Sequence, residues 1–378
     1  MIKGLSLFSN VGIAETYLKE VGVDIIIANE LLEDRAKFYE HLYPECNMIC
    51  GDITHKDVID KVVEEALLRK VEFVIATPPC QGMSKAGLKD KDDARNFLIT
   101  YAIDVIKKIK PKYVLIENVV QQLRTTVLYK GEKTLIPSMI ESELGAEYEI
   151  NTENILNTEK FGVPQRRTRA LFLLVRKDLG IKWEIPETNE KIVTLMEAIG
   201  DLPSLDPPIK EEGMTERVFP NYEEKRLAGL AVSKWHYARP HVWRNVECMM
   251  HTSPGCSARK NPVYYPKNRE GKLVGGSVQA YTRMEWDQPA PTVTTYNHTI
   301  SSFRNVHPGY LDEQTGLCSD PRVLTIFELM RITTLPDDWD IPDWASELLI
   351  RQVIGEGIPP LAIKKVVAEL KLLEKKDD

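Results

Sequence analysis

The chain has 378 residues, of which 43% are hydrophobic, and its formal net charge is -7 at pH 7. This length and apolar content exclude a disordered chain and allow one large and one smaller packed domain. No apolar run approaches the roughly 20 residues that span a bilayer, and the first residues predict a strand and not a signal peptide. We therefore expect a cytoplasmic protein with no membrane partner.

Strand-like and helix-like segments alternate through the first part of the chain. Short apolar runs that predict strands occupy residues 5–8, 25–28, 48–50, 71–76, 114–116, 150–156 and 171–175. Amphipathic stretches that predict helices lie between them, at residues 13–21, 32–43, 57–69, 94–109 and 134–144. Strand, helix and strand at this spacing predict an α/β fold with a parallel, doubly wound sheet.

The alternation ends after Lys177, where prolines and acidic residues mark a boundary region. Helical patterns return only at residues 325–334 and 360–373. A second, smaller, irregular domain is therefore expected between the boundary region and the first of these helical patterns. Residues 231–280 hold eight basic and two acidic side chains, interleaved with Trp235, Tyr237, Trp243, Tyr264 and Tyr265. Despite the net negative charge, this pattern favours a nucleic-acid surface over a merely solvated one.

The cysteines have no regular spacing. They stand at positions 46, 50, 80, 248, 256 and 318, which predicts free thiols in a cytoplasmic protein. Cys248, His251 and Cys256, with His241 nearby, raise the alternative of a zinc site. Because no Cys-x2-Cys pair is repeated, we expect no bound metal.

A thiol and a carboxylate follow two neighbouring strand-like runs. Residues 77–84 read TPPCQGMS directly after one run, so Cys80 is a candidate nucleophile. Glu117, in the sequence Glu-Asn-Val, ends the next run. The carboxyl ends of parallel strands meet at one edge, so both side chains are expected in one crevice. A buried structural cysteine is the alternative, which the flanking prolines and Gln81 disfavour.

Two further segments have the residues of a ligand site. Residues 5–12 predict a strand and a tight turn, although only Gly12 remains of a three-glycine fingerprint, and an ordinary turn is the alternative. Glu30 and Asp52 end the second and third strands, and Glu30 is placed to accept hydrogen bonds from ribose hydroxyls. Residues 162–169 read GVPQRRTR, whose guanidinium groups suit phosphates or a base carbonyl.

These blocks, in this order, resemble the DNA (cytosine-5) methyltransferase family of the bacterial restriction-modification type, whose nucleophile segment is Pro-Cys-Gln and whose acidic segment is Glu-Asn-Val. The resemblance extends from residue 5 to residue 360. It implies a Rossmann-like methyltransferase sheet with a separate target-recognition domain. It also implies sequence-specific transfer of the methyl group of S-adenosyl-L-methionine to C5 of a flipped-out cytosine in double-stranded DNA, leaving S-adenosyl-L-homocysteine.

The resemblance also implies residue roles. Cys80 would form the covalent adduct with cytosine C6, Glu117 would contact N3, Arg169 would contact O2, and Arg167 would support the active site or its backbone. Residues implied to bind the cofactor are Phe8, Gly12, Glu30, Leu31, Asp52, Ile53, Pro79, Leu98 and Glu356. The chain departs from the family pattern at Asn10 (usually Gly), Ile13 (usually Gly), Phe327 (usually Arg), Glu356 (usually Asn) and Gly357 (usually Ser).

The implied domains are a catalytic domain of residues 1–188, completed by residues 350–378, and a target-recognition domain with hinge at residues 189–349. The segment from Gln81 to Arg95 is expected to close over the base, with Ser84 and Lys85 on phosphates. The other residues expected to contact DNA are Arg239, Arg244, Arg259, Lys260 and Arg283, although Tyr281 to Arg283 also resemble shared scaffold.

We expect a monomer, the default for an asymmetric DNA-reading enzyme, bound to DNA at the nucleoid. A cognate restriction endonuclease is a possible partner that would act separately. Three alternatives are open. An exocyclic-amino DNA methyltransferase needs no thiol, so Cys80 disfavours it. A tRNA cytosine-5 methyltransferase would share the chemistry but has no evident need for the basic, aromatic insert. A catalytically silent DNA-binding relative would be expected to lose Cys80 or Glu117, and both are present.

Overall fold

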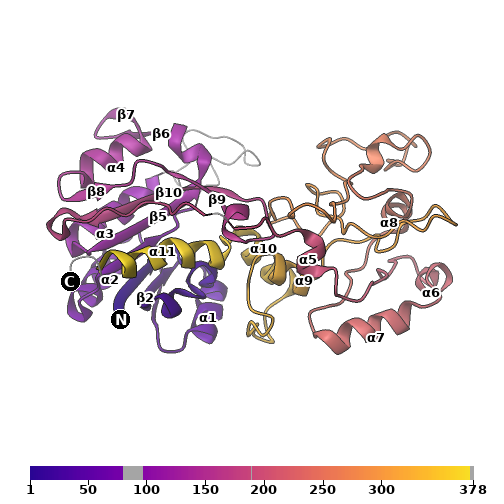
Figure 1. Cartoon of the computed structure of the whole chain (residues 1–378), viewed down its shortest axis with the longest axis horizontal. Coiled ribbons are helices and arrows are strands. Elements are labelled where there is room, and N and C mark those ends of the chain that lie inside the picture. Colours follow the sequence, from indigo (N-terminus) through magenta and orange to yellow (C-terminus); the bar gives the residue numbers. More distant parts are fainter. Residues whose placement is uncertain (80–96, 189, 375–378) are drawn as a thin grey trace.

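The protein is described by a computed structural model that covers residues 1–79, 97–188 and 190–374, with side chains up to residue 370. Figure 1 shows two lobes side by side, and both chain ends lie in the lobe that holds the sheet. This eight-stranded sheet has the order β3-β2-β1-β4-β5-β10-β8, with β9 paired to β10. Its strands are β1 (Ile2–Leu7), β2 (Val23–Glu30), β3 (Asn47–Cys50), β4 (Phe73–Ala76), β5 (Tyr113–Val119), β8 (Tyr148–Ile150), β9 (Ile155–Asn157) and β10 (Thr168–Arg176).

The sheet is mixed, so the expectation of a fully parallel sheet is wrong in its last third. Strands β1 to β5 are parallel, whereas β10 is antiparallel to β5, to β8 and to β9. No helix long enough for a crossover separates β8, β9 and β10. A parallel pairing requires a crossover of about a dozen residues, and a chain that turns back directly pairs antiparallel.

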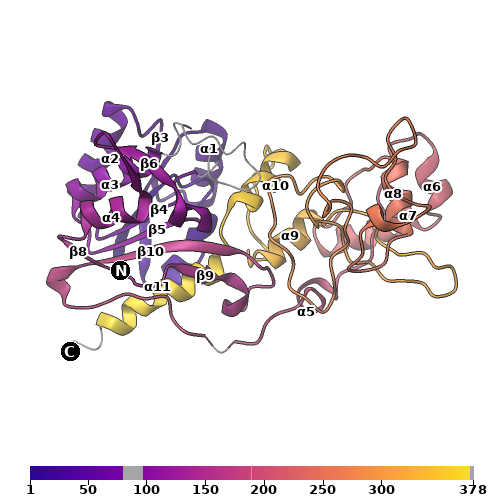
Figure 2. The ribbon, with the colours of Figure 1, turned by 90° about the horizontal axis from the view of Figure 1, so that it is seen from above.

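Helices cover both faces of this sheet (Figure 2). One face packs against α2 (Lys56–Arg69), α3 (Leu98–Ile109) and α4 (Ile136–Leu144), and the other against α11 (Pro360–Glu374). In β4, Val74 faces the first cluster and Phe73 and Ile75 face the second. This alternation is the two-residue period of a strand that is buried on both sides. Helix α1 (Glu33–Leu42) contacts β2 and β3.

Two expected elements differ in the structure. Residues 13–21 form two short 3-10 helices, η1 (Ile13–Glu15) and η2 (Leu18–Val21), because left-handed glycines at positions 12 and 22 bound the segment. The strand expected at residues 150–156 divides into β8 and β9. Asn151 causes the break: its Oδ1 accepts from the Leu173 N–H at 2.9 Å and its Nδ2 donates to the Leu171 carbonyl at 3.2 Å. A side chain thus replaces one half of the backbone ladder at this point, whereas the Asn151 N–H still donates to the Leu173 carbonyl at 3.0 Å.

The remaining elements of the sheet lobe are a hairpin of β6 (Thr126–Tyr129) and β7 (Glu132–Leu135), which the sequence did not predict, and the 3-10 helices η4 (Val120–Arg124), η5 (Thr158–Phe161) and η6 (Lys177–Leu179). Among the described residues, no helix is both long and apolar enough to cross a membrane.

The second lobe contains α6 (Met214–Val218), α7 (Tyr222–Val232), α8 (Trp243–Met250) and η7 (Ala258–Lys260). Helices α5 (Leu195–Ile199), α9 (Ile326–Ile332) and α10 (Glu347–Glu356) lie between the lobes in Figure 1. Buried ions stabilise the second lobe: Arg322 pairs with Asp320 and with Glu328, each at 2.8 Å. Glu328 also completes a capping box with Thr325 at the start of α9.

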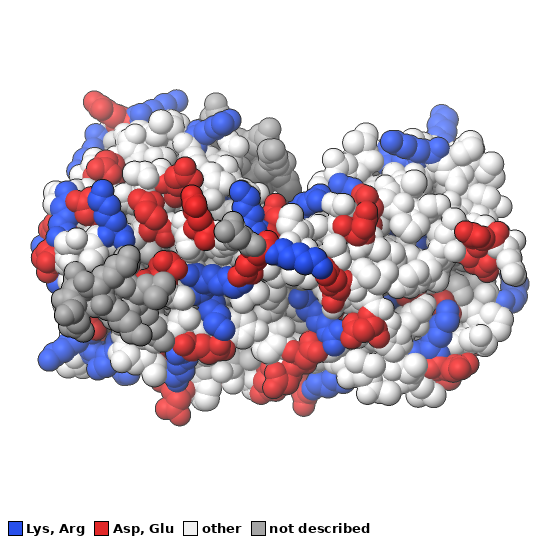
Figure 3. Space-filling view, viewed as in Figure 1, with Lys and Arg blue, Asp and Glu red and all other residues white. Residues whose placement is uncertain are grey.

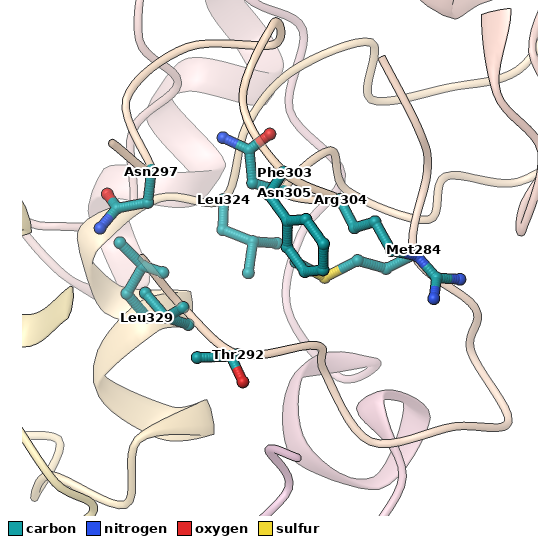
Figure 4. A pocket seen from close by; sticks show the side chains of 9 residues that line it. Met284, Thr292, Asn297, Phe303, Arg304, Asn305, Leu324 and Leu329 are labelled. Carbon is teal, nitrogen blue, oxygen red and sulfur yellow. The ribbon is translucent and has the colours of Figure 1, made fainter. Parts of the chain in front are cut away.

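A small pocket lies beside α9, and Figure 4 shows its lining. It is lined by Met284, Thr292, Val293, Asn297, Phe303, Arg304, Asn305, Leu324 and Leu329. Most of these side chains are apolar or already bonded within the lobe, so we assign no ligand to this pocket.

Candidate active site

The ends of β4 and β5 bring the nucleophile segment beside the acidic residue. Ala76 pairs with Ile116, so the chain leaves β4 next to Glu117. Asn118, 3% exposed, donates from Nδ2 to the Pro78 carbonyl at 3.0 Å. Asn118 therefore fixes the backbone that leads to Cys80, a role that the sequence motif alone did not reveal. Cys80, Gln81, Ser84, Lys85 and the expected closing segment lie outside the described residues.

Glu117 and Arg169 form a buried ion pair. Arg169 lies opposite Val119 in the antiparallel pair of β10 and β5, which places its side chain diagonally across from Glu117. Arg169 Nε and Glu117 Oε1 are 2.8 Å apart. Burial raises the pKa of the Glu117 carboxyl, and the neighbouring Arg169 and Arg167 only partly oppose this. Glu117 therefore retains a proton at higher pH than an ordinary glutamate does.

Arg167 is placed to position backbone. It is 2% exposed, and its guanidinium donates to the carbonyls of Val293, Gly355 and Glu356 at 2.9, 3.0 and 2.8 Å. It thus ties the start of β10 to the end of α10 and to the segment around residue 293. Gln165 acts on the same segment, because its Oε1 accepts from the Val293 N–H at 3.3 Å.

The turn after β1 has an unusual backbone. Phe8, Asn10 and Gly12 all have positive φ, at 58°, 51° and 77°. A side chain at position 12 would collide with Tyr39 and Tyr43, so glycine is required there for space as well as for conformation. Thr77 Oγ1 donates to the Phe8 carbonyl at 3.0 Å and so links this turn to the end of β4.

The tips of β2 and β3 lie along the same edge. Glu30 Oε2 accepts from the Asn10 N–H at 2.9 Å and its Oε1 accepts from the Leu32 N–H at 3.0 Å. Two donors orient this carboxylate and leave further lone pairs for a ligand. Leu31 is 57% exposed. Asp52 is half-buried, and its Oδ1 accepts from the Thr54 N–H at 2.9 Å.

The structure fits a partly polar, partly apolar ligand at this edge. Phe8 after β1, Ile53 after β3 and Leu98 at the start of α3 belong to one apolar cluster, and Pro79 is half-buried after β4. Ser9 Oγ and Asn10 Oδ1 are buried and have no hydrogen-bond partner among the described residues. Unpaired buried polar atoms beside apolar groups match a nucleoside joined to an amino acid. Glu356 also reaches this turn, because its carboxylate accepts from Asn10 Nδ2 at 3.0 Å.

The cations expected to contact DNA are not equally available. Arg244 and Lys260 are exposed. Arg239 pairs with Glu347 at 2.9 Å, and Arg259 Nη1 donates to the Val274 carbonyl at 2.8 Å.

The expectation that Arg283 contacts DNA is wrong. This residue is 0% exposed and donates to five backbone carbonyls, those of Met249, His307, Pro308, Ser319 and Asp320. All its donors are directed inward, so Arg283 organises the second lobe from within.

Among the residues that the structure describes, no group of three or more His, Cys, Asp or Glu side chains is arranged to hold a metal ion.

The strand order, the polar strand tips and the buried carboxylate define the class as a Rossmann-like methyltransferase. Comparison with known proteins specifies the family. Residues 2–372 match the family model described as C-5 cytosine-specific DNA methylase, and the chain belongs to this family. It is thus a DNA (cytosine-5) methyltransferase, in a family that depends on S-adenosylmethionine and acts on DNA.

The chain is also similar to individual relatives and solved structures that are named as methyltransferases. The Type II methyltransferase M1.HgaI of Avibacterium volantium is 46% identical over 377 residues, which cover 98% of both chains. The Type II methyltransferase M.DdeI of Desulfomicrobium norvegicum is 27% identical over 376 residues, 94% of this chain and 85% of that one. The fold matches a DNA modification methyltransferase of an E. coli prophage, with a TM-score of 0.70 at 19% identity over 99% of this chain and 100% of that one. It also matches the S. pombe Dnmt2 methyltransferase, with a TM-score of 0.61 at 15% identity over 100% of both chains.

Proposed function

We propose that this enzyme is the modification methyltransferase of a Type II restriction system, and that it methylates one cytosine within a specific sequence of double-stranded DNA. The observation that carries the catalytic part is the buried pair of Glu117 and Arg169 beside the segment that leads to Cys80. The similarity to M1.HgaI along the whole chain supports the restriction-modification context. We further propose that the enzyme acts as a monomer and that its cognate endonuclease binds DNA separately.

Cys80 is proposed as the nucleophile because C5 of cytosine reacts poorly by itself. Addition of the Cys80 thiolate to C6 moves electron density through the ring to C5. Glu117, which holds a proton readily, donates it at N3 and so neutralises the charge that develops there. Arg169, which pairs with the Glu117 carboxylate, donates a hydrogen bond to O2 of the same base. After C5 has taken up the methyl group and lost its proton to solvent, the Cys80–C6 bond breaks, the sulfur leaves as a thiolate, and the proton at N3 returns to Glu117.

S-adenosyl-L-methionine would supply the methyl group. We propose that Ile53, Leu98 and Pro79 enclose its adenine, that Phe8 lines its methionine part, and that Leu31 covers the rim. Glu30 would accept from the ribose hydroxyls, Asp52 from the adenine amino group, and the turn that ends at Gly12 would hold the amino acid end together with Glu356. Their placement at one edge of the sheet supports these assignments.

We assign catalysis to residues 1–188 with 350–378, and DNA reading to residues 189–349. Figure 3 shows a hollow between the two lobes, which suits a bound duplex. A stacked base cannot present C6 to a thiol, so the target cytosine must leave the helix at a cost of a few kcal/mol. Arg239, Arg244, Arg259 and Lys260 are proposed DNA contacts on the second lobe.

The test is covalent trapping. The full chain is incubated with S-adenosylmethionine and a library of duplexes that contain 5-fluorocytosine, which cannot release its C5 substituent. We expect a denaturant-resistant adduct that is enriched in one sequence, absent in Cys80→Ser and retained in the matched control Cys256→Ser, which changes an exposed cysteine of the second lobe. An adduct that forms only with RNA would instead support a tRNA enzyme, and binding without an adduct would support a silent relative.

A further inference from the structure

Side chains from three distant parts of the chain meet at the turn after β1. Arg35 on α1 donates to both oxygens of the Glu356 carboxylate, at 2.8 Å and 3.1 Å. Asn10 Nδ2 donates to this carboxylate at 3.0 Å and Gln352 Nε2 at 3.1 Å. Four donated hydrogen bonds therefore fix the orientation of one carboxylate. Gln352 is exposed, so its hydrogen bond is the one that an incoming ligand can replace, and this leaves an acceptor site on Oε1 for the ligand.

This cluster is sheltered from solvent. The side chains of Arg35 and Glu356 are 13% and 22% exposed. A bidentate pair with this burial is stronger and more directional than a typical surface ion pair. Loss of either partner leaves the other charge poorly compensated.

The backbone beneath Glu356 is held independently of Arg35. Arg167 donates to the carbonyls of Gly355 and Glu356 at 3.0 and 2.8 Å. Gly357 lies against Ile13, where an added Cβ would come within 2.9 Å of the Ile13 side chain. Arg35 and Asn10 therefore set the direction of the Glu356 side chain and not the path of the chain.

Unused polar atoms belong to the turn that contacts this carboxylate through Asn10. Asn10 Oδ1 and Ser9 Oγ are buried without a hydrogen-bond partner among the described residues, and Ser9 is 6% exposed. An amide oxygen and a carboxylate suit an ammonium group, and a hydroxyl can donate to a carboxylate. Together they match the two ends of an α-amino acid.

We propose that Arg35 and Asn10 are positioning residues that direct the Glu356 carboxylate toward the α-ammonium group of the cofactor. This inference rests on the cofactor site of the proposed function. It also explains two departures from the family pattern as one coupled change, because Asn at position 10 and Glu at position 356 contact each other and Arg35 balances the added charge.

The test is calorimetric binding of S-adenosylhomocysteine, which carries the same amino acid end, to the full chain. We expect Arg35→Gln and Glu356→Gln each to weaken binding about tenfold. The double variant should bind no more weakly than the worse single one, because the two residues act as a unit. Arg69→Gln removes a pair with Glu65 on α2 at 3.0 Å and should bind like the wild type.

Further variants separate positioning from folding. Arg35→Lys keeps the charge and loses the second hydrogen bond, so its affinity should fall between those of the wild type and Arg35→Gln. The double variant Asn10→Gly with Glu356→Asn restores the usual family pair and should bind more tightly than Glu356→Asn alone. In turnover assays, Arg35→Gln should raise the KM for S-adenosylmethionine while kcat stays within about twofold.

The contrary outcomes are distinct. Wild-type affinity in Arg35→Gln, or additive losses in the double variant, would overturn the inference and leave the proposed function intact. If the wild type binds neither S-adenosylmethionine nor its product, the proposed cofactor site fails and this inference fails with it.

Discussion

At the scale of single residues, Glu117 is the side chain whose environment is most directly matched to chemistry. Burial raises the pKa of its carboxyl, while Arg169 at 2.8 Å favours the anion. These opposing influences allow one group to hold a proton in one state of the reaction and to release it in another. An ordinary surface glutamate would remain ionised throughout.

The substitution Glu117→Gln tests this role. Glutamine keeps the size and an oxygen that can accept from Arg169, but it can no longer deliver or take up a proton at N3. We expect kcat to fall by about 10²- to 10⁴-fold, the usual contribution of a general acid, with unchanged affinity for S-adenosylhomocysteine. Single-turnover transfer of labelled methyl groups would measure this loss. A loss of about tenfold or more would support the role, and a loss below about threefold would contradict it.

Glu15 is a second buried carboxyl, and it lies in η1, directly after the turn that ends at Gly12. It accepts from Ser6 Oγ at 2.5 Å and from the Tyr39 hydroxyl. Burial, only partly opposed by these hydrogen bonds, raises its pKa from 4.5 to about 7. Between these two values the folded protein keeps a proton that the unfolded chain has lost, so this group stabilises the fold below pH 4.5 and the contribution is lost as the pH rises to about 7.

Glu15→Gln should therefore remove a pH dependence of stability. The free energy of unfolding of the variant minus that of the wild type should rise by up to about 3 kcal/mol from about pH 4 to about pH 8, since one pKa unit corresponds to 1.36 kcal/mol. Urea unfolding at both pH values gives this difference. The same difference between the two proteins at both pH values would show that Glu15 does not titrate in this interval.

At the scale of elements, α9 combines a local signal with a tertiary one. Thr325 and Glu328 form its capping box, which is readable from sequence. Glu328 also pairs with the buried Arg322 at 2.8 Å, and Arg322 together with His307 lowers its pKa to about 2 although burial acts in the opposite direction. The start of this helix is therefore fixed by charges that do not contact solvent.

Two arginines near α9 allow a matched comparison. Arg322→Met leaves Asp320 and Glu328 buried without their cation and should cost about 3–5 kcal/mol of stability. Arg331→Met removes pairs with Asp201 and Asp337, whose side chains are 66% and 54% exposed, and should cost less than about 1 kcal/mol. Thermal unfolding of both variants gives the comparison, and equal losses would contradict the importance of burial.

The elements also show what sequence could predict. The strands β1 to β5 and helices α1 to α4 follow from periodicity, because each has a buried face with a regular spacing. The break at Asn151 was not predictable, since it depends on a side chain that bonds to Leu171 and Leu173 of β10, 20 and 22 residues later along the chain. The second lobe was expected to be irregular, but its internal order depends on buried charges such as Arg283, which look like surface cations in sequence.

At the scale of the whole molecule, distant parts of the chain meet at the site. Glu30 and Glu117 could be predicted because each lies at or near the carboxyl end of a strand, and parallel strand ends meet at one edge. Arg35 could not, because its partner Glu356 is 321 residues away and no local pattern connects them. Asn118 was visible as part of a motif, but its bond to Pro78 depends on the pairing of β4 with β5.

The C-terminal helix α11 completes the fold of the N-terminal lobe. Ile363, Val366 and Leu370 pack with Phe73 and Leu173 on the face of the sheet opposite α3. Trp183 Nε1 donates to the Val366 carbonyl at 2.9 Å. The sheet lobe can therefore close its core only after the whole chain, including the second lobe, has been made.

Two substitutions on α11 test this dependence. Ile363 is 0% exposed, and Ile363→Ala should destabilise the protein by about 2–5 kcal/mol because the cavity would lie against the sheet. Leu361 is only partly buried at the edge of the same cluster, so Leu361→Ala should cost less than half as much, about 1 kcal/mol. Urea unfolding followed by circular dichroism measures both. If neither variant loses stability, or if a chain ending at Gly357 unfolds like the full chain, then α11 is an appendage, and its proposed assignment to the catalytic domain is wrong.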